Sequence, residues 1–129
     1  MDTINGGSGN DYIYGGLGAD VLAGGNSSDN FVFDVALNSG IDRITDFSRI
    51  YDTIRLENAV FGALTSTGQL SSSAFYTGSA AHDATDRIIY NAGTGALYYD
   101  PDGTGASAPV QFALLGNGLR LSASDFHVI

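Results

Sequence analysis

The pattern of apolar and polar residues repeats every nine residues over the first quarter of the chain. The large apolar positions of this period are Ile4, Ile13, Leu22 and Phe31. Each stands at the centre of a three-residue segment of the kind that forms a short, half-buried strand. Paired glycines precede the later segments and permit the positive φ of a tight turn. The pattern therefore predicts a coil of turns and strands, in which two repeats complete one circuit and repeat n stacks on repeat n+2.

An aspartate keeps the same period as the apolar residue, at Asp2, Asp11, Asp20 and Asp29. A glycine-rich start is also typical of a flexible linker, but a linker holds no fixed phase of glycine, aspartate and apolar residue. Asp2 completes a turn whose glycines are absent. We therefore expect the repeat array to be truncated at its N-terminus and to continue upstream in a longer parent protein.

The period stops after Val32, and shorter strand patterns follow. We expect strands over residues 31–33, 41–47, 52–56, 74–77, 87–90, 96–99, 110–115 and 126–129. Residues 87–90 and 96–99 flank a glycine-containing turn and predict a hairpin. Residues 58–74 predict loop and short helical turns, and residues 78–86 a polar loop. The similar segments 70–75 and 121–126 predict a helical turn that leads into a strand.

Composition narrows the class of protein. The 129 residues suit one domain with a real core, and 43% of them are hydrophobic. The formal net charge of -9 predicts a surface that repels nucleic acid and anionic membranes but gathers cations. The absence of cysteine excludes disulfides, cysteine metal sites and thiol nucleophiles. No apolar run is long enough to insert into a membrane, and no N-terminal signal peptide is seen.

The repeat offers the ligands that calcium prefers. Calcium takes six to eight oxygen ligands, including carboxylates and backbone carbonyls. A glycine turn leaves its carbonyls bare, and the aspartate adds negative charge. One turn holds too few oxygens, whereas two stacked turns together offer about six. Magnesium fits less well because it demands tighter octahedral geometry, and zinc prefers nitrogen and sulfur.

The pattern G-G-x-G-x-D-x-U-x, with U large and apolar, resembles the RTX (repeats-in-toxin, hemolysin-type) nonapeptide. The resemblance implies an all-β fold, in which residues 1–34 form a short parallel β-roll with Ca²⁺ between its turns. Residues 35–129 would cap it as a β-sandwich-like, antiparallel region. Ser27 departs from the pattern, because glycine is expected there.

The resemblance also implies three calcium sites, each built from two turns of the same edge. The first, which is complete, would use Gly7, Gly9, Asp11, Gly24, Asn26 and Asp29. The second would use Asp2, Gly15, Leu17 and Asp20 without its upstream glycines. The third would pair Gly16, Gly18 and Asp20 with the non-repetitive segment 37–42, in which Gly40 and Asp42 match in kind.

Three further aspartates are candidates for calcium. Asp46 is expected either to cap the roll or to join a calcium site. Asp100 and Asp102 lie in a D-x-D-G segment that resembles a calcium loop, although it lacks the later glutamate of an EF-hand. A tight hairpin turn explains the same residues.

The C-terminal half resembles the region that follows RTX repeats in proteins exported by type I secretion. The final residues 125–129 are similar to the uncleaved export signal of that family, although His127 departs from its apolar ending. The resemblance implies a secreted protein that meets a type I ABC transporter during export and folds on Ca²⁺ outside the cell.

Catalysis is not expected in this chain. His82 and His127 are the only histidines, and neither belongs to an H-E-x-x-H motif. Residues 6–10 lack the final glycine of a nucleophile elbow. Any catalytic activity is expected upstream in the parent protein. An alternative function is polysaccharide binding, as in the RTX modules of alginate-modifying enzymes, with Tyr12, Tyr14, Tyr98 and Tyr99 as stacking residues.

Overall fold

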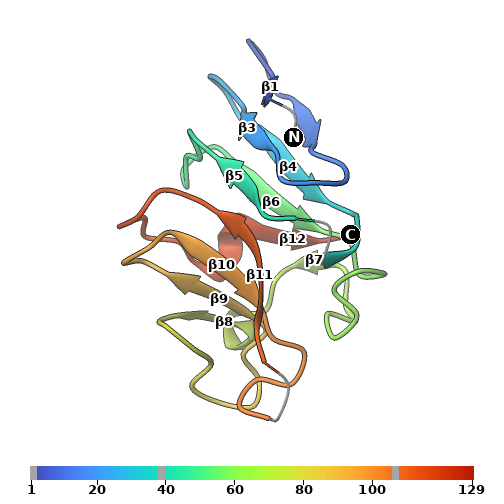
Figure 1. Cartoon of the computed structure of the whole chain (residues 1–129), viewed down its shortest axis with the longest axis vertical. Helices are drawn as coiled ribbons and strands as arrows, with labels where there is room; N and C mark the ends of the chain where they lie inside the picture. Colours follow the sequence, from blue (N-terminus) through green and yellow to red (C-terminus); the bar gives the residue numbers. More distant parts are fainter. Residues whose placement is uncertain (1–2, 38–39, 106–107) are drawn as a thin grey trace.

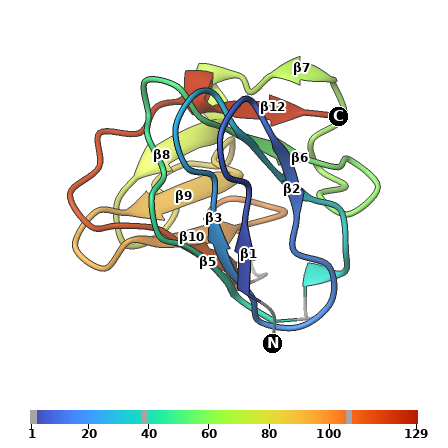
Figure 2. The same cartoon turned by 90° about the horizontal axis from the view of Figure 1, so that it is seen from above.

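A computed structural model describes residues 3–37, 40–105 and 108–129. Two β-sheets face each other, which confirms the expected all-β class (Figures 1 and 2). The described residues form a seven-stranded sheet in the order β1-β3-β5-β11-β10-β9-β8, here called sheet A. They also form a five-stranded sheet in the order β2-β4-β6-β12-β7, here called sheet B. In this part of the chain, no helix is long and apolar enough to cross a bilayer.

The strands are short, as the repeat predicts. Their bounds are β1 Thr3–Asn5, β2 Tyr12–Tyr14, β3 Val21–Ala23, β4 Asn30–Phe33, β5 Asp42–Ile44, β6 Thr53–Leu56, β7 Gly68–Gln69, β8 Phe75–Thr77, β9 Ile88–Asn91, β10 Ala96–Tyr99, β11 Val110–Leu114 and β12 Phe126–Val128. Two 3₁₀ turns, η2 (Ser72–Ala74) and η3 (Ala123–Asp125), lead into β8 and β12. The helical turns expected before these two strands are thus confirmed.

The repeats alternate between the two sheets. Strand β1 pairs in parallel with β3, where Ile4 lies opposite Leu22. Strand β2 pairs in parallel with β4, where Ile13 lies opposite Phe31. The predicted stacking of repeat n on repeat n+2 is therefore confirmed. The apolar side chain of each repeat points inward, and Ile13, Leu22 and Phe31 are buried.

Both sheets continue beyond the repeats without a break. Strand β5 pairs in parallel with β3, and β6 pairs in parallel with β4. Strand β11 then joins β5, and β12 joins β6, so that the last strand of the chain lies between β6 and β7 in sheet B (Figure 1). Among the described residues, antiparallel pairing is confined to β9–β10–β11 and to β12–β7. The boundary proposed after residue 34 thus marks the end of the nine-residue period, and both sheets cross it.

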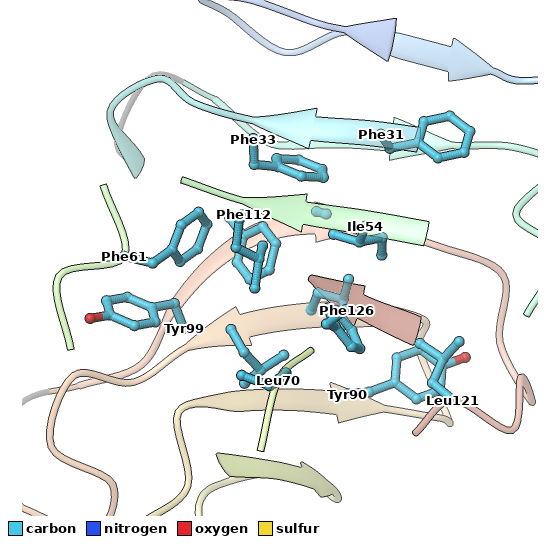
Figure 3. Close-up of a cluster of buried hydrophobic side chains, with 14 of the residues drawn as sticks. Phe31, Phe33, Ile54, Phe61, Leu70, Tyr90, Tyr99, Phe112, Leu121 and Phe126 are labelled. Atoms are coloured by element: carbon cyan, nitrogen blue, oxygen red, sulfur yellow. The ribbon is translucent and has the colours of Figure 1, made fainter. Parts of the chain in front are cut away.

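A cluster of aromatic side chains fixes the two sheets together (Figure 3). The ring of Phe112 in β11 meets the rings of Phe33 and Phe61 edge-on, at centroid distances of 5.2 Å and 5.1 Å. Phe61 also meets Tyr99 edge-on, at 5.2 Å. Such pairs add stability beyond the area that they bury. Most of this core comes from residues outside the repeats. The glycine turns, which connect the strands of the two sheets, are therefore supported by the larger, non-repetitive part of the fold.

Candidate metal sites in the glycine turns

The backbone of each repeat turn is left-handed at its second and fourth positions. In the first turn these are Gly7 (φ +83°) and Gly9 (φ +90°). In the third turn Gly25 has a φ of +87°, and Ser27 keeps the same shape with a φ of +75°. Serine rarely adopts this conformation, because its Cβ approaches the following carbonyl. Serine in place of glycine at position 27 therefore adds backbone strain but leaves the conformation of the turn unchanged.

The first predicted site is brought together by the stacking of turn 6–11 on turn 24–29. The backbone N–H of Asp11 donates to Oδ1 of Asp29 at 2.9 Å. A Cβ built on Gly6 would lie 2.6 Å from Oδ2 of Asp11 and 3.0 Å from the carbonyl oxygen of Gly24. The carbonyl oxygen of Gly7 likewise faces the backbone of Gly25. Oxygens from both turns therefore converge at one edge of the roll.

This first site contains two carboxylate oxygens without a protein partner. Oδ2 of Asp11 and Oδ2 of Asp29 are both buried, and neither accepts a hydrogen bond from the described residues. A buried charged oxygen is destabilising unless a donor or a cation meets it. Hard carboxylate and carbonyl oxygens are the donor set of calcium, so these residues fit that ion. Gly9 and Asn26, the other predicted ligands, lie exposed in the same two turns.

A second carboxylate pair forms at the opposite edge, where the third site was predicted. The N–H of Asp20 donates to Oδ1 of Asp42 at 3.0 Å. A Cβ built on Gly15 would lie 2.7 Å from Oδ2 of Asp42 and 3.3 Å from Oδ2 of Asp20. Burial, reinforced by the neighbouring Asp20, raises the pKa of Asp42 to about 6. The structure thus brings Asp20 and Asp42 together, although residues 37–42 are no repeat.

The other predicted ligands belong to the third site and to the second site. The backbone of Gly40 packs against the peptide between Gly18 and Ala19, where a Cβ would lie 2.5 Å from the carbonyl carbon of Gly18. Gly16 has the left-handed φ of its turn, +76°. The predicted second site depends on Asp2, which lies outside the described residues. Leu17, its predicted carbonyl donor, is exposed at the tip of turn 15–20.

Turn 46–52 lies beside turn 24–29 and contains the two aspartates that continue this edge. Asp46 accepts hydrogen bonds from the N–H groups of Gly24 at 2.9 Å and Gly25 at 2.8 Å. Asp52 accepts from the N–H of Asp29 at 3.0 Å and of Ser48 at 2.8 Å. Of the two roles predicted for Asp46, this geometry is that of a cap.

Asp52 lies at this edge beside the first predicted site, and the sequence prediction missed it. A signal for it exists, because an aspartate two residues before a buried apolar side chain recurs from Asp11 onward in the rungs of the roll. The later examples are Asp42 before Ile44 and Asp52 before Ile54. The glycine pairs end at Gly25, but the aspartate continues in register for one more turn at each edge.

The D-x-D-G segment lies far from these turns, at the β8–β9–β10 end of sheet A (Figure 1). Asp100 is buried, burial raises its pKa, and its Oδ1 accepts the N–H of Asp102 at 3.2 Å. The adjacent loop contains His82, whose Nδ1 lies 2.5 Å from Oδ2 of the buried Asp86. Calcium at Asp100 and Asp102 stays a prediction.

The outer face of sheet B carries exposed tyrosines. Tyr12 and Tyr14 are 58% and 53% exposed. The guanidinium of Arg55 lies 5.3 Å from the ring centre of Tyr12, and its Nη1 lies 3.4 Å from Oδ1 of Asn30. By contrast, Tyr99 is buried in the core and does not face solvent. Tyr99 therefore cannot stack on a sugar in this fold.

Comparison with known proteins finds one family of repeats and several solved structures. Residues 1–31 match the family of the RTX calcium-binding nonapeptide repeat, in four copies. No curated protein matches the chain. The fold is similar to the solution structure of the AlgE6R3 subunit from the Azotobacter vinelandii mannuronan C5-epimerase, with a TM-score of 0.56 and 22% identity. That match covers 97% of this chain and 66% of the solved subunit, and at this identity it is a likeness of fold.

Proposed function

We propose that this chain, whose first 31 residues are calcium-binding RTX repeats, is a calcium-gated module of a secreted protein. The observation that supports it best is the stacking of turn 6–11 on turn 24–29. There, Asp11 and Asp29 each bury a carboxylate oxygen that accepts no hydrogen bond from the described residues. Calcium at this position supplies the missing positive charge and joins the two turns.

Calcium controls the order of the repeat half in this proposal. Without the ion, like charges face each other at both edges of the roll, and the glycine turns lose much conformational entropy on folding. The ion binds the native turns only, and therefore stabilises them as its concentration exceeds Kd. For an extracellular module we expect a Kd on the order of 10⁻⁴–10⁻³ M. The two turns of the site are then unjoined inside the cell and joined outside it.

The C-terminal segment supports export before folding. Strand β12 pairs with β6 on one side and with β7 on the other. The side chains of Phe126 and Val128 in this strand are buried. In the folded chain this segment is therefore covered, and only an unfolded chain presents it to a transporter. We propose that it is the signal for a type I ABC transporter, and that export needs no N-terminal signal peptide.

Circular dichroism and calorimetry with and without EDTA test the gating proposal. We expect chelation to remove strand signal and to lower the melting temperature, and calcium in excess to restore both. Magnesium at the same concentration is the control, and it should restore neither. A cooperative transition that is unchanged by chelation would refute gating, and a calorimetric titration without heat of calcium binding would refute the site itself.

A second candidate function is polysaccharide binding on the outer face of sheet B. The exposed Tyr12 and Tyr14 offer flat rings, and Arg55 and Asn30 beside them offer hydrogen-bonding groups. The similar solved structure is a subunit of a mannuronan C5-epimerase. A glycan array in calcium buffer tests this function, with Tyr14→Ser as the variant. Tyr51→Ser is the matched control, because Tyr51 is 60% exposed on turn 46–52. Binding that both variants retain in full would argue against this face.

A further inference from the structure

Three carboxylates at one edge of the roll differ in what their oxygens meet. Asp29 uses Oδ1 to accept the N–H of Asp11 and buries an Oδ2 that has no hydrogen-bond partner among the described residues. Asp46 and Asp52 instead use both oxygens to accept backbone N–H groups. Converging N–H dipoles create a positive potential that disfavours a cation. The same residue type therefore has two roles here, ligation at Asp29 and support at the other two.

The hydrogen bonds of Asp46 and Asp52 are directed at the turn that holds half of the calcium ligands. Gly24 and Gly25, which donate to Asp46, begin this turn, and Asp29, which donates to Asp52, ends it. Three backbone donors of one ligating turn are thus satisfied without calcium. Carboxylates that accept backbone N–H groups form hydrogen bonds about twice as strong as neutral pairs.

Turn 46–52 is itself held by contacts that need no ion. The N–H of Asp52 donates to the carbonyl of Ser48 at 2.8 Å, and Oδ2 of Asp52 accepts the N–H of Ser48. Phe47 is buried against Phe31, with ring centres 6.1 Å apart. The N–H of Thr53 also donates to the carbonyl of Asp29 at 2.9 Å. The hydrophobic core therefore fixes turn 46–52, which in turn fixes turn 24–29.

We propose that Asp46 and Asp52 are positioning residues for calcium, which hold turn 24–29 in its ligating shape in the calcium-free protein. Calcium then joins turn 6–11 to this preformed half. The inference rests on the proposed calcium site between the two turns. It adds that the two halves of this site differ in order before the ion arrives. Turn 46–52 follows turn 24–29 at this edge of the roll, and its carboxylates accept backbone N–H groups instead of binding a further ion.

Amide hydrogen exchange on the unmodified protein tests the preformed half-site directly. In EGTA, the amides of Gly24, Gly25 and Asp29 should exchange slowly. The amides of Gly6 and Asp11 also donate, to Ala23 and Asp29, but their turn joins the outermost strands β1 and β2. They should therefore exchange quickly and become protected only when calcium is added. Equal, fast exchange of both groups in EGTA would overturn the inference.

Calorimetric titration of Asp46→Asn with calcium separates positioning from ligation. Asparagine keeps one acceptor but turns an NH₂ group toward the second backbone donor. We expect calcium affinity to fall about 10- to 100-fold, as for loss of one hydrogen bond to a charged group, with unchanged stoichiometry. The matched control is Asp34→Asn, which removes the same charge from an exposed side chain and should stay within about twofold.

Two results of this titration would overturn the inference. If Asp46→Asn binds one ion fewer at unchanged affinity, Asp46 is a ligand. If its affinity equals that of Asp34→Asn, Asp46 has no positioning role. The proposed function fails on a different result, the absence of calcium binding by the unmodified protein. If Asp46→Asn does not fold, the exchange experiment on the unmodified chain still decides.

Discussion

Replacement of Asp29 by asparagine should change stability in opposite directions with and without calcium. Asp29 is 1% exposed. Its Oδ1 accepts the N–H of Asp11, and its Oδ2 meets no hydrogen-bond donor among the described residues. Asparagine keeps an acceptor for Asp11 and removes the charge. The variant therefore leaves the backbone contacts of the turn in place and changes what the site offers to a cation.

The size of each effect follows from these contacts. In the calcium-free protein, a buried carboxylate oxygen without a partner destabilises the fold by about 1–3 kcal/mol, and the neutral amide should recover about 1 kcal/mol of this. With calcium at 100 times Kd, the ion stabilises the unmodified fold by about 2.7 kcal/mol. A 100-fold loss of affinity reduces this to about 0.4 kcal/mol. Asp29→Asn should thus be less stable than the unmodified protein by about 1 kcal/mol in calcium, after its gain in the ion-free fold.

Urea denaturation in EGTA and in excess calcium measures both effects on one protein. The midpoint of Asp29→Asn should lie above that of the unmodified chain in EGTA and below it in calcium. Asp34→Asn, an exposed site with the same charge change, is the control and should shift little in either buffer. A midpoint that falls equally in both buffers would refute our reasoning, because Asp29 would then act only through packing.

Three further predictions follow from single contacts. Ser27→Gly should raise stability by about 0.5–1 kcal/mol in urea denaturation, because it relieves a φ of +75° but adds freedom to the unfolded chain. The pKa of Asp42 is raised to about 6 from 3.8, so the calcium-free native state binds this proton more tightly than the unfolded chain does. Its contribution to calcium-free stability should therefore grow as the pH falls from above 6 toward 3.8, while calcium affinity falls. Because burial also raises the pKa of Asp52 and Asp125, Asp42→Asn should weaken both trends in denaturation and titration at pH 5 and pH 7.5. Tyr90→Phe should lower stability by about 1–3 kcal/mol equally with and without calcium, because the buried hydroxyl donates to Gly116 and accepts from Leu119. A calcium-dependent effect of Tyr90→Phe in the same denaturation assay would contradict the separation of core and site.

The repeat half of the fold could be predicted closely, because each structural element there is local. The nine-residue period places the turns, the strands and the inward side chain, and parallel pairing of repeats follows from two turns per circuit. The hairpin β9–β10 is equally local, since Ala96 pairs with Asn91 across a short turn. Its strand patterns and its glycine lie within one stretch of sequence.

The pairing of the later strands could not be predicted, because it joins distant segments. Strand β12 pairs with β6 although Phe126 and Ile54 are far apart in the chain. No turn chemistry fixes this register; it follows from filling the core between the two sheets. Asp52 escaped prediction for a related reason. It stacks on Asp29 at a spacing that residues 34–52 lengthen beyond the two-repeat interval, so the period no longer points to it.

The aspartate of each rung has one constant role and one variable role. At Asp29, Asp42 and Asp52, Oδ1 accepts the N–H of the aspartate one rung before it. This role is structural, and it explains why the aspartate continues where the glycine pairs end. The variable role belongs to Oδ2. Where it meets no donor, as in Asp29, it fits calcium, and where a backbone N–H meets it, as in Asp52, it closes the roll.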